Sequence, residues 1–110
     1  MMSDSRLEQL LAFHEQDPND PFILYGIALE YQKDSPEQAR SFFETLLRRF
    51  PDYLPTYYHA AKLYEETGEV EKARRTYEKG VEISKDQKNS HALRELQNAL
   101  TNLLFENDLL

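Results

Sequence analysis

The stretch YYHAAKLYEETGEVEKARRTYEKG, residues 57–80, has a regular internal pattern. It has two halves of mixed tyrosine, alanine, leucine and charged residues, and Thr67 and Gly68 separate them. Glycine readily adopts the left-handed backbone conformation that ends many helices, so this dipeptide predicts a turn between two helices. Within each half, small and aromatic residues recur at helical spacing. The stretch therefore predicts a helical hairpin whose helices meet through small and aromatic side chains.

The same pattern occurs once more, earlier in the chain. Ala39 and Ala73 are 34 residues apart, whereas Phe22 and Tyr57 are 35 apart. The difference is explained by one extra residue in the turn of the earlier hairpin. A fixed period of this length indicates a protein built from stacked helical repeats.

The repeated residues resemble the tetratricopeptide repeat pattern, W-x2-L-G-x2-Y followed by A-x3-F and a closing proline. The resemblance places two repeats at residues 20–53 and 54–87, with helices capping both ends of the stack. The residues at the pattern positions are Phe22, Tyr25, Gly26, Leu29, Ala39, Phe43 and Pro51 in the first repeat, and Tyr57, Ala60, Ala61, Tyr64, Ala73 and Tyr77 in the second.

Proline, glycine and polar residues predict where the helices begin and end. Asp20 and Ser35 each precede a proline and are expected to cap the helices that follow; for Ser35, Gln38 completes a capping box. No alternating strand pattern occurs. We expect one all-α domain over residues 1–110, an α-α superhelix of about six antiparallel helices. The expected segments are an N-terminal cap helix (4–16), helices over about 21–33, 36–50, 55–67 and 69–85, and a C-terminal cap (88–110).

The second repeat departs from the family pattern at two positions. Lys85 stands where the closing proline is expected, and Gly80 replaces the usual alanine, so we expect this helix to run on or to flex near its end. Residues 88–105 start on the 34-residue period, but Glu95 occupies a small-residue position. They are therefore interpreted as a cap helix and not as a third repeat.

The composition excludes several kinds of function. The formal net charge is -7, which disfavours nucleic acid as a partner. There is no cysteine, so disulfides, thiolate metal sites and thiol nucleophiles are ruled out. The N-terminal sequence has no run long enough for a signal or membrane segment, and we expect an unprocessed protein of the cytoplasm without membrane contact.

Catalytic and metal-binding patterns are weak. His14, His59 and His91 are widely spaced, and acid pairs such as Glu65 and Glu66 lie at helix ends, where they are usually solvated. No phosphate loop or nucleophile elbow is present. We expect no enzyme activity, no cofactor and no metal; a metal-dependent hydrolase is the less favoured alternative.

The resemblance implies that the first helix of each repeat lines a groove for a peptide or a partner helix. The groove would be aliphatic and aromatic at one end and acidic at the other. An alternative stays open for Ile23, Leu24 and Ile27, which could instead pack against neighbouring helices, and for Leu24 we favour packing. The implied groove residues are Ile23, Leu24, Ile27, Glu30 and Tyr31 from the first repeat and Tyr58, His59, Lys62, Glu65 and Glu66 from the second.

The chain is thus predicted to be a scaffold or adaptor module. The expected partner places apolar groups near Ile27, Tyr31 and Tyr58 and a basic group near Glu30, Glu65 or Glu66. Only Lys62 is of the type used by family members that clamp a carboxylate, so we do not expect such a clamp.

A homo-oligomeric subunit is the alternative function. One leucine stripe of the last helix is expected to pack on the protein, but apolar residues continue beyond it, and exposed apolar patches often mark contacts. A homodimer through this helix would explain them. The stripe is Leu93, Leu96, Leu100 and Leu103, and the additional residues are Leu104, Phe105, Leu109 and Leu110.

Overall fold

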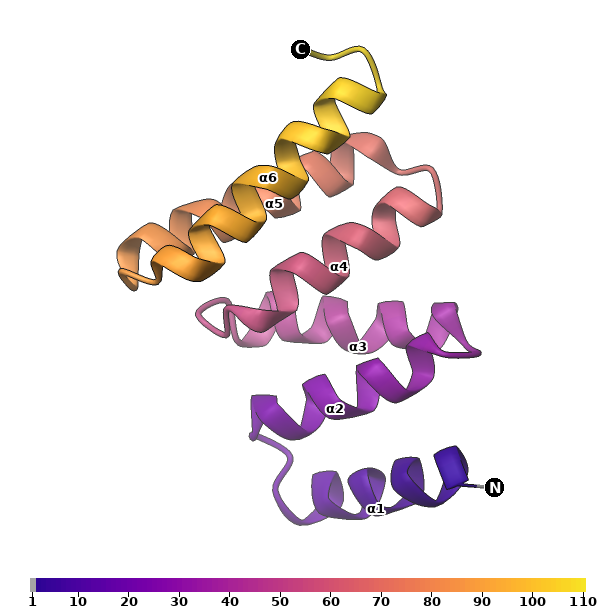
Figure 1. Cartoon of the computed structure of the whole chain (residues 1–110). Coiled ribbons are helices and arrows are strands. Elements are labelled where there is room, and N and C mark those ends of the chain that lie inside the picture. Colours follow the sequence, from indigo (N-terminus) through magenta and orange to yellow (C-terminus); the bar gives the residue numbers. More distant parts are fainter. Residues whose placement is uncertain (1) are drawn as a thin grey trace. The chain divides into compact units, whose positions relative to one another are not determined.

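The computed structural model describes residues 2–110, with side chains from residue 5 onward. This part of the chain contains six helices and no strand. Figure 1 shows how the chain runs through them. The predicted all-α class is confirmed, and the bounds of the first five helices agree with the prediction to within two residues, whereas the C-terminal cap predicted over 88–110 is helical only over Ser90–Glu106. The helices are α1 (Met2–Gln16), α2 (Pro21–Gln32), α3 (Pro36–Arg49), α4 (Pro55–Glu66), α5 (Val70–Asp86) and α6 (Ser90–Glu106).

The chain forms two compact units, one ending at Tyr53 and the other beginning at Leu54. The first unit contains α1, α2 and α3, and the second contains α4, α5 and α6. Within each unit, consecutive helices run antiparallel (Figure 1). In the first unit α2 packs against both α1 and α3; in the second, α5 packs against both α4 and α6.

The helix starts follow the predicted signals except at Ser35. The Asp20 carboxylate accepts a hydrogen bond of 2.9 Å from the Phe22 backbone N–H, and Pro21 opens α2. Ser35 makes no side-chain capping bond, so the predicted capping box is wrong. Its ψ of 71° departs from the extended backbone of an ordinary cap, such as the ψ of 108° at Asp20. Asn89, which the sequence analysis missed, caps α6 by accepting from the Ala92 N–H at 3.0 Å.

The turn at Gly68 has the predicted left-handed conformation, with a φ of 78°. The Gly68 N–H donates to the Glu65 carbonyl at 3.0 Å, and the Glu69 N–H donates to the Tyr64 carbonyl at 2.8 Å. This pair of bonds satisfies carbonyls that the end of α4 would otherwise leave open. The hairpin predicted from residues 57–80 is confirmed.

The core combines small and aromatic residues of the repeat pattern with aliphatic side chains such as Leu24, Leu46 and Leu103. Small side chains let helix backbones approach closely, and aromatic rings fill the space where helices diverge. Six residues that the pattern places in the core are confirmed as buried: Ala39, Phe43, Ala61, Tyr64, Ala73 and Tyr77.

Gly80 is part of this core and does not interrupt its helix. A Cβ atom at this position would lie 2.8 Å from Tyr57 Cβ and 3.1 Å from Leu96 Cδ1. Glycine is therefore required where α5 passes α4 and α6. Because Gly80 is buried and Lys85 is not a helix breaker, α5 runs on to Asp86. This is one of the two outcomes expected from the sequence.

Candidate functional site

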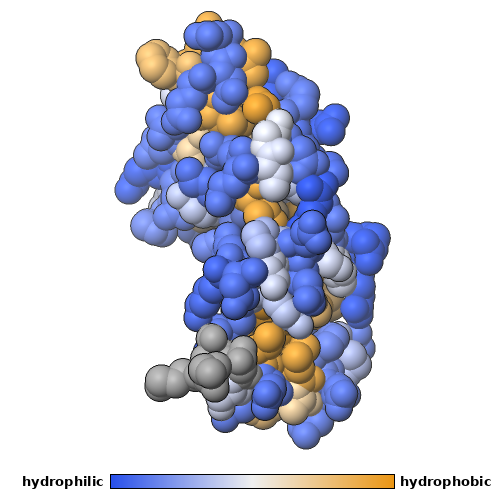
Figure 2. All heavy atoms as spheres, turned by 90° about the vertical axis from the view of Figure 1, so that its right-hand side faces the viewer, coloured by the Kyte–Doolittle hydropathy of each residue, from blue (hydrophilic) through white to orange (hydrophobic). Residues whose placement is uncertain are grey.

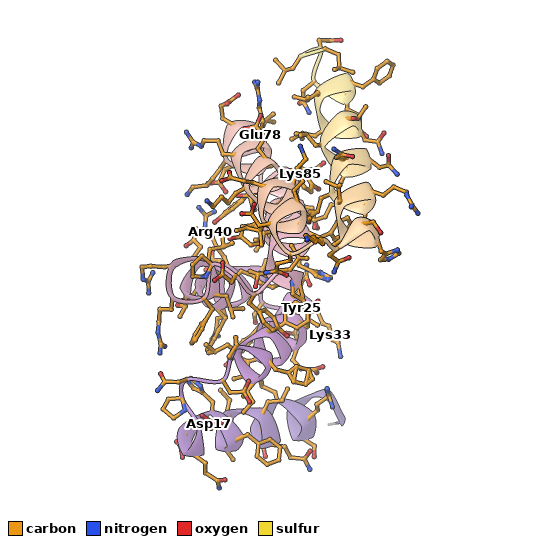
Figure 3. The ribbon with its side chains drawn as sticks, turned by 90° about the vertical axis from the view of Figure 1, so that its left-hand side faces the viewer. Asp17, Tyr25, Lys33, Arg40, Glu78 and Lys85 are labelled. Atoms are coloured by element: carbon orange, nitrogen blue, oxygen red, sulfur yellow. The ribbon has the colours of Figure 1, made fainter. Side chains whose placement is uncertain are left out.

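In the first unit, α1 covers one face of α2. A Cβ at Gly26 would lie 3.3 Å from the end of the Leu10 side chain. Glu30, one turn further on, pairs with Arg6 of α1 at 3.2 Å and with Lys33 at 3.1 Å. Lys33 follows the last turn of α2 and is labelled in Figure 3. With only 8% of its side chain exposed and two cations beside it, the Glu30 carboxylate is poorly placed to receive a partner's basic group.

Packing also buries two of the four apolar residues predicted to line the groove on α2. Leu24 and Ile27 are 1% and 0% exposed, so neither side chain can touch a ligand in this conformation. For Leu24 the favoured interpretation, packing, is confirmed. Ile23 is half-buried, and the half-buried Tyr31 stacks on Phe42 of α3, with ring centroids 5.6 Å apart. Only these two residues keep some exposed apolar surface.

In the second unit, the predicted residues of α4 share one continuous side of the helix. Lys62 and Glu66 are exposed, whereas Tyr58, His59 and Glu65 are half-buried. The Tyr58 ring lies edge-on to His59, with centroids 5.7 Å apart. This side of α4 thus combines an aromatic surface with two carboxylates and one lysine.

The Glu65 carboxylate is held in place by its neighbours. The Tyr77 hydroxyl of α5 donates a hydrogen bond to it, and the Lys62 ammonium lies 3.9 Å away. Burial raises the pKa of Tyr77 well above its usual value, and the hydrogen bond to Glu65 raises it further. Tyr77 therefore stays neutral and acts as a donor, which fixes one oxygen of Glu65.

Two carboxylates of α6 act on the same region, and sequence reasoning did not assign them to the site. Burial lowers the pKa of His59, and the charge of Glu95 partly opposes this effect. The charge of Glu106 contributes to the raised pKa of Tyr77. The signal that could have identified them is the repeat period, because α6 begins 35 residues after α4 and so corresponds to the first helix of a further repeat. We define the α4/α6 face as Tyr58, His59, Lys62, Glu65, Glu66, Glu95 and Glu106.

Within the described residues, no group of three or more histidine or acidic side chains is arranged to hold a metal ion. Over the same range, no helix is both long enough and apolar enough to cross a membrane.

The fold and this face define a class of protein. It is a helical-hairpin repeat protein that presents polar and aromatic side chains on the first helix of a pair. A family model described as tetratricopeptide repeat matches residues 30–96, more than half of the chain. The chain belongs to the tetratricopeptide repeat family. No curated protein matches it.

Solved structures agree with this assignment. A tetratricopeptide repeat domain protein from Salinibacter ruber is 40% identical over 79% of this chain and 89% of its own, with a TM-score of 0.76. A protein from Bordetella parapertussis is 21% identical over 94% of this chain and 90% of its own, with a TM-score of 0.79. PcrH, in complex with the chaperone binding region of PopD, is 15% identical over 96% of this chain and 81% of its own, with a TM-score of 0.86. The last two likenesses show the fold alone, and they confirm the predicted α-α superhelix class.

Proposed function

We propose that the protein is a non-enzymatic interaction module that binds a peptide or a partner helix on the α4/α6 face. Proteins of this fold are typically non-catalytic and bind other proteins or peptides. The observation that supports this face most is the fixed Glu65 carboxylate, which accepts a hydrogen bond from the Tyr77 hydroxyl, and the Tyr77 ring lies edge-on to Tyr58. A carboxylate whose position is already fixed loses little freedom when it binds a cation.

The chemistry of the face indicates the kind of partner. Four of its seven residues are acidic and one is a lysine, so a basic segment would be attracted at low salt. Tyr58 offers a half-buried ring against which an apolar or cationic side chain can pack. We therefore propose a partner that places an apolar anchor at Tyr58 and a lysine or arginine at Glu65 and Glu66.

The predicted residues of α2 contribute less to this proposal. Ile23 and Tyr31 remain candidates for an apolar contact, whereas Ile27 and Glu30 are dropped because one is buried and the other is paired twice. PcrH was solved with a segment of PopD, so a protein of the same fold can hold a segment of another protein. A cytoplasmic location remains part of the proposal.

Calorimetric titration with amphipathic peptides tests the proposed partner. An amphipathic helical peptide with leucine on one face and lysine on the other should bind. The same peptide with glutamate in place of lysine should not. Glu66→Lys should weaken binding about fivefold, the effect of about 1 kcal/mol. Glu37→Lys makes the same charge change at an exposed residue of α3, outside the face, and should leave the affinity unchanged. Equal binding of both peptides, or equal effects of the two variants, would contradict the proposed charge preference.

The hydrolase alternative makes a different prediction. A metal-dependent hydrolase would retain metal after purification and would lose turnover when His59 is replaced by alanine. Elemental analysis of the purified protein, with hydrolysis assays on wild type and His59→Ala, separates the two functions. We expect no stoichiometric metal and no turnover that depends on His59.

Self-association through the end of α6 is a second candidate function, favoured by a separate observation. Phe105 and Leu110 are 72% and 76% exposed, and Leu109 is 46% exposed. Sedimentation measurements over a range of concentrations test it directly. A mass that rises toward that of a dimer supports the candidate, and a constant monomer mass rejects it.

A further inference from the structure

Apolar residues at the end of α6 and just beyond it form a surface patch, in which Leu104 is half-buried and the other three residues are exposed. We define the C-terminal patch as Leu104, Phe105, Leu109 and Leu110. The Leu109 N–H donates to the Leu104 carbonyl at 2.8 Å, and Asp108 has a φ of 56°, so a regular helix-ending turn fixes the last residues. In Figure 2 apolar surface gathers at the level of this end of the chain. Exposed apolar patches often mark contact surfaces.

The opposite end of α6 has a cleft of complementary character. Its volume is about 340 Å³, and Leu93 contributes apolar surface to it. Lys85 and Lys88 line the cleft, and no carboxylate is among its lining residues. We define the α5/α6 cleft by these lining residues: Ser84, Lys85, Lys88, Asn89, Ser90 and Leu93.

The C-terminal patch and the α5/α6 cleft lie in segments of opposite charge. The segment that carries the C-terminal patch, residues 104–110, contains Glu106 and Asp108 and no cation. Residues 84–94 contain Lys85, Lys88 and Arg94 against a single carboxylate, Asp86. In a chain with a net charge of -7, this basic segment stands out. An acidic apolar surface and a basic apolar surface attract each other.

One copy cannot bring its own two surfaces together. They lie at opposite ends of α6, which has 17 residues and is therefore about 25 Å long. Figure 1 shows the two ends of this helix pointing in opposite directions. When the α6 helices of two copies lie antiparallel, however, the C-terminal end of each lies beside the N-terminal end of the other. The arrangement has twofold symmetry, and both contacts form at once.

From these observations we infer that the protein forms a dimer in which two α6 helices run antiparallel and each C-terminal patch occupies the α5/α6 cleft of the second copy. This inference rests on the self-association candidate above and adds the surfaces and the direction of pairing. The occupant is a second copy of this chain because its patch supplies both the apolar side chains and the negative charge that the cleft lacks.

Cysteine cross-linking tests the direction of pairing, because the natural chain has no cysteine. Ser90→Cys labels the cleft, and Leu110→Cys labels the patch. When the two single variants are mixed and oxidised, a disulfide-linked dimer should appear on a non-reducing gel. Neither variant alone should cross-link, because identical positions lie at opposite ends of the pair. Dimers linked through Ser90→Cys alone or through Leu110→Cys alone would overturn the antiparallel arrangement.

Charge exchange tests the same contact without cysteine. Lys85→Glu alone and Glu106→Lys alone should each raise the dimer dissociation constant about fivefold, and the double variant should restore it. Arg75→Glu, a charge reversal at an exposed residue of α5 outside the cleft, is the matched control and should change nothing. Circular dichroism of each variant establishes that the helices are intact.

The outcomes separate this inference from the function on which it rests. A monomer at all concentrations rejects both self-association and the antiparallel pair. A dimer without the cross-link between positions 90 and 110, or a double variant that stays as weak as the single variants, keeps self-association and overturns these surfaces. The cross-link together with restored affinity establishes both.

Discussion

At the scale of single residues, Gly80 shows how closely three helices of the second unit approach. Alanine at this position would raise helix propensity by about 1 kcal/mol. Its Cβ, however, would lie 2.8 Å from Tyr57 Cβ, an atom next to the α4 backbone that cannot move freely. Overpacking of this kind typically costs about 1 to 3 kcal/mol. Gly80→Ala should therefore lower the urea midpoint of unfolding.

Gly26→Ala is the matched control for this prediction. The added Cβ would lie 3.3 Å from the Leu10 Cδ2 atom, the end of a flexible side chain that can rotate away. We expect a stability equal to that of the wild type or slightly higher. Equal stability of Gly80→Ala and Gly26→Ala would show that α5 does not approach α4 as closely as described.

Tyr77 links the core to the α4/α6 face through its hydroxyl. Tyr77→Phe removes the hydrogen bond to the Glu65 carboxylate while keeping the ring. Hydrogen bonds to charged groups contribute about 1.5 to 3 kcal/mol to the free energy of unfolding. Because water can reach Glu65, we expect a loss near the lower end of this range. Denaturant unfolding measures it. Tyr53→Phe, a half-buried ring beside Tyr25, should cost less, and the reverse order would contradict the role of the Tyr77 hydroxyl.

The lowered pKa of His59 should make the stability of the protein depend on pH in mild acid. Burial lowers its pKa in the folded protein, so the unfolded chain binds a proton more readily. The contribution of His59 to the free energy of unfolding should therefore be constant at neutral pH. It should decrease as the pH falls below about 6.5, the ordinary pKa of histidine. The difference in unfolding free energy between wild type and His59→Gln, measured from pH 8 to 5, isolates it. A difference that grows in favour of the wild type on acidification would contradict the buried position.

At the scale of helices, the hairpin of α4 and α5 depends on alanine at position 73. Ala73 is fully buried, so phenylalanine there would force the helices apart and cost about 1 to 3 kcal/mol. Ala12→Phe, at an exposed position of α1, is the control and should change stability by less than about 0.5 kcal/mol. An unchanged melting temperature of Ala73→Phe would contradict the repeat assignment.

The helices could be predicted from sequence because local residues determine their ends. Pro21, Pro36 and Pro55 each open a helix, and Gly68 closes one. Ser35 failed as a cap because side-chain capping depends on a backbone geometry that residue type alone does not fix. The period of small residues likewise predicted the core, since only small side chains allow close helix contacts.

At the scale of the whole molecule, the candidate site was only partly predictable. The repeat pattern identifies which helix comes first in each hairpin, and this located the residues of α4. It does not say which face a capping helix covers, so the pairing of Glu30 with Arg6 was missed. Glu95 and Glu106 were missed because their effects on His59 of α4 and on Tyr77 of α5 arise only when α6 folds back along α5. Contacts between distant segments, unlike helix ends, have no local sequence signal.

We propose that a basic, partly apolar segment binds the α4/α6 face. Amide chemical-shift mapping by NMR, during titration with a leucine-lysine helical peptide, shows which residues the segment contacts. We predict that the largest shifts cluster on Tyr58, Lys62, Glu65 and Glu66 of α4 and on Glu95 and Glu106 of α6, and that they shrink as salt is added. Shifts confined to residues outside this face, such as the exposed positions of α3 and α5, would contradict the account.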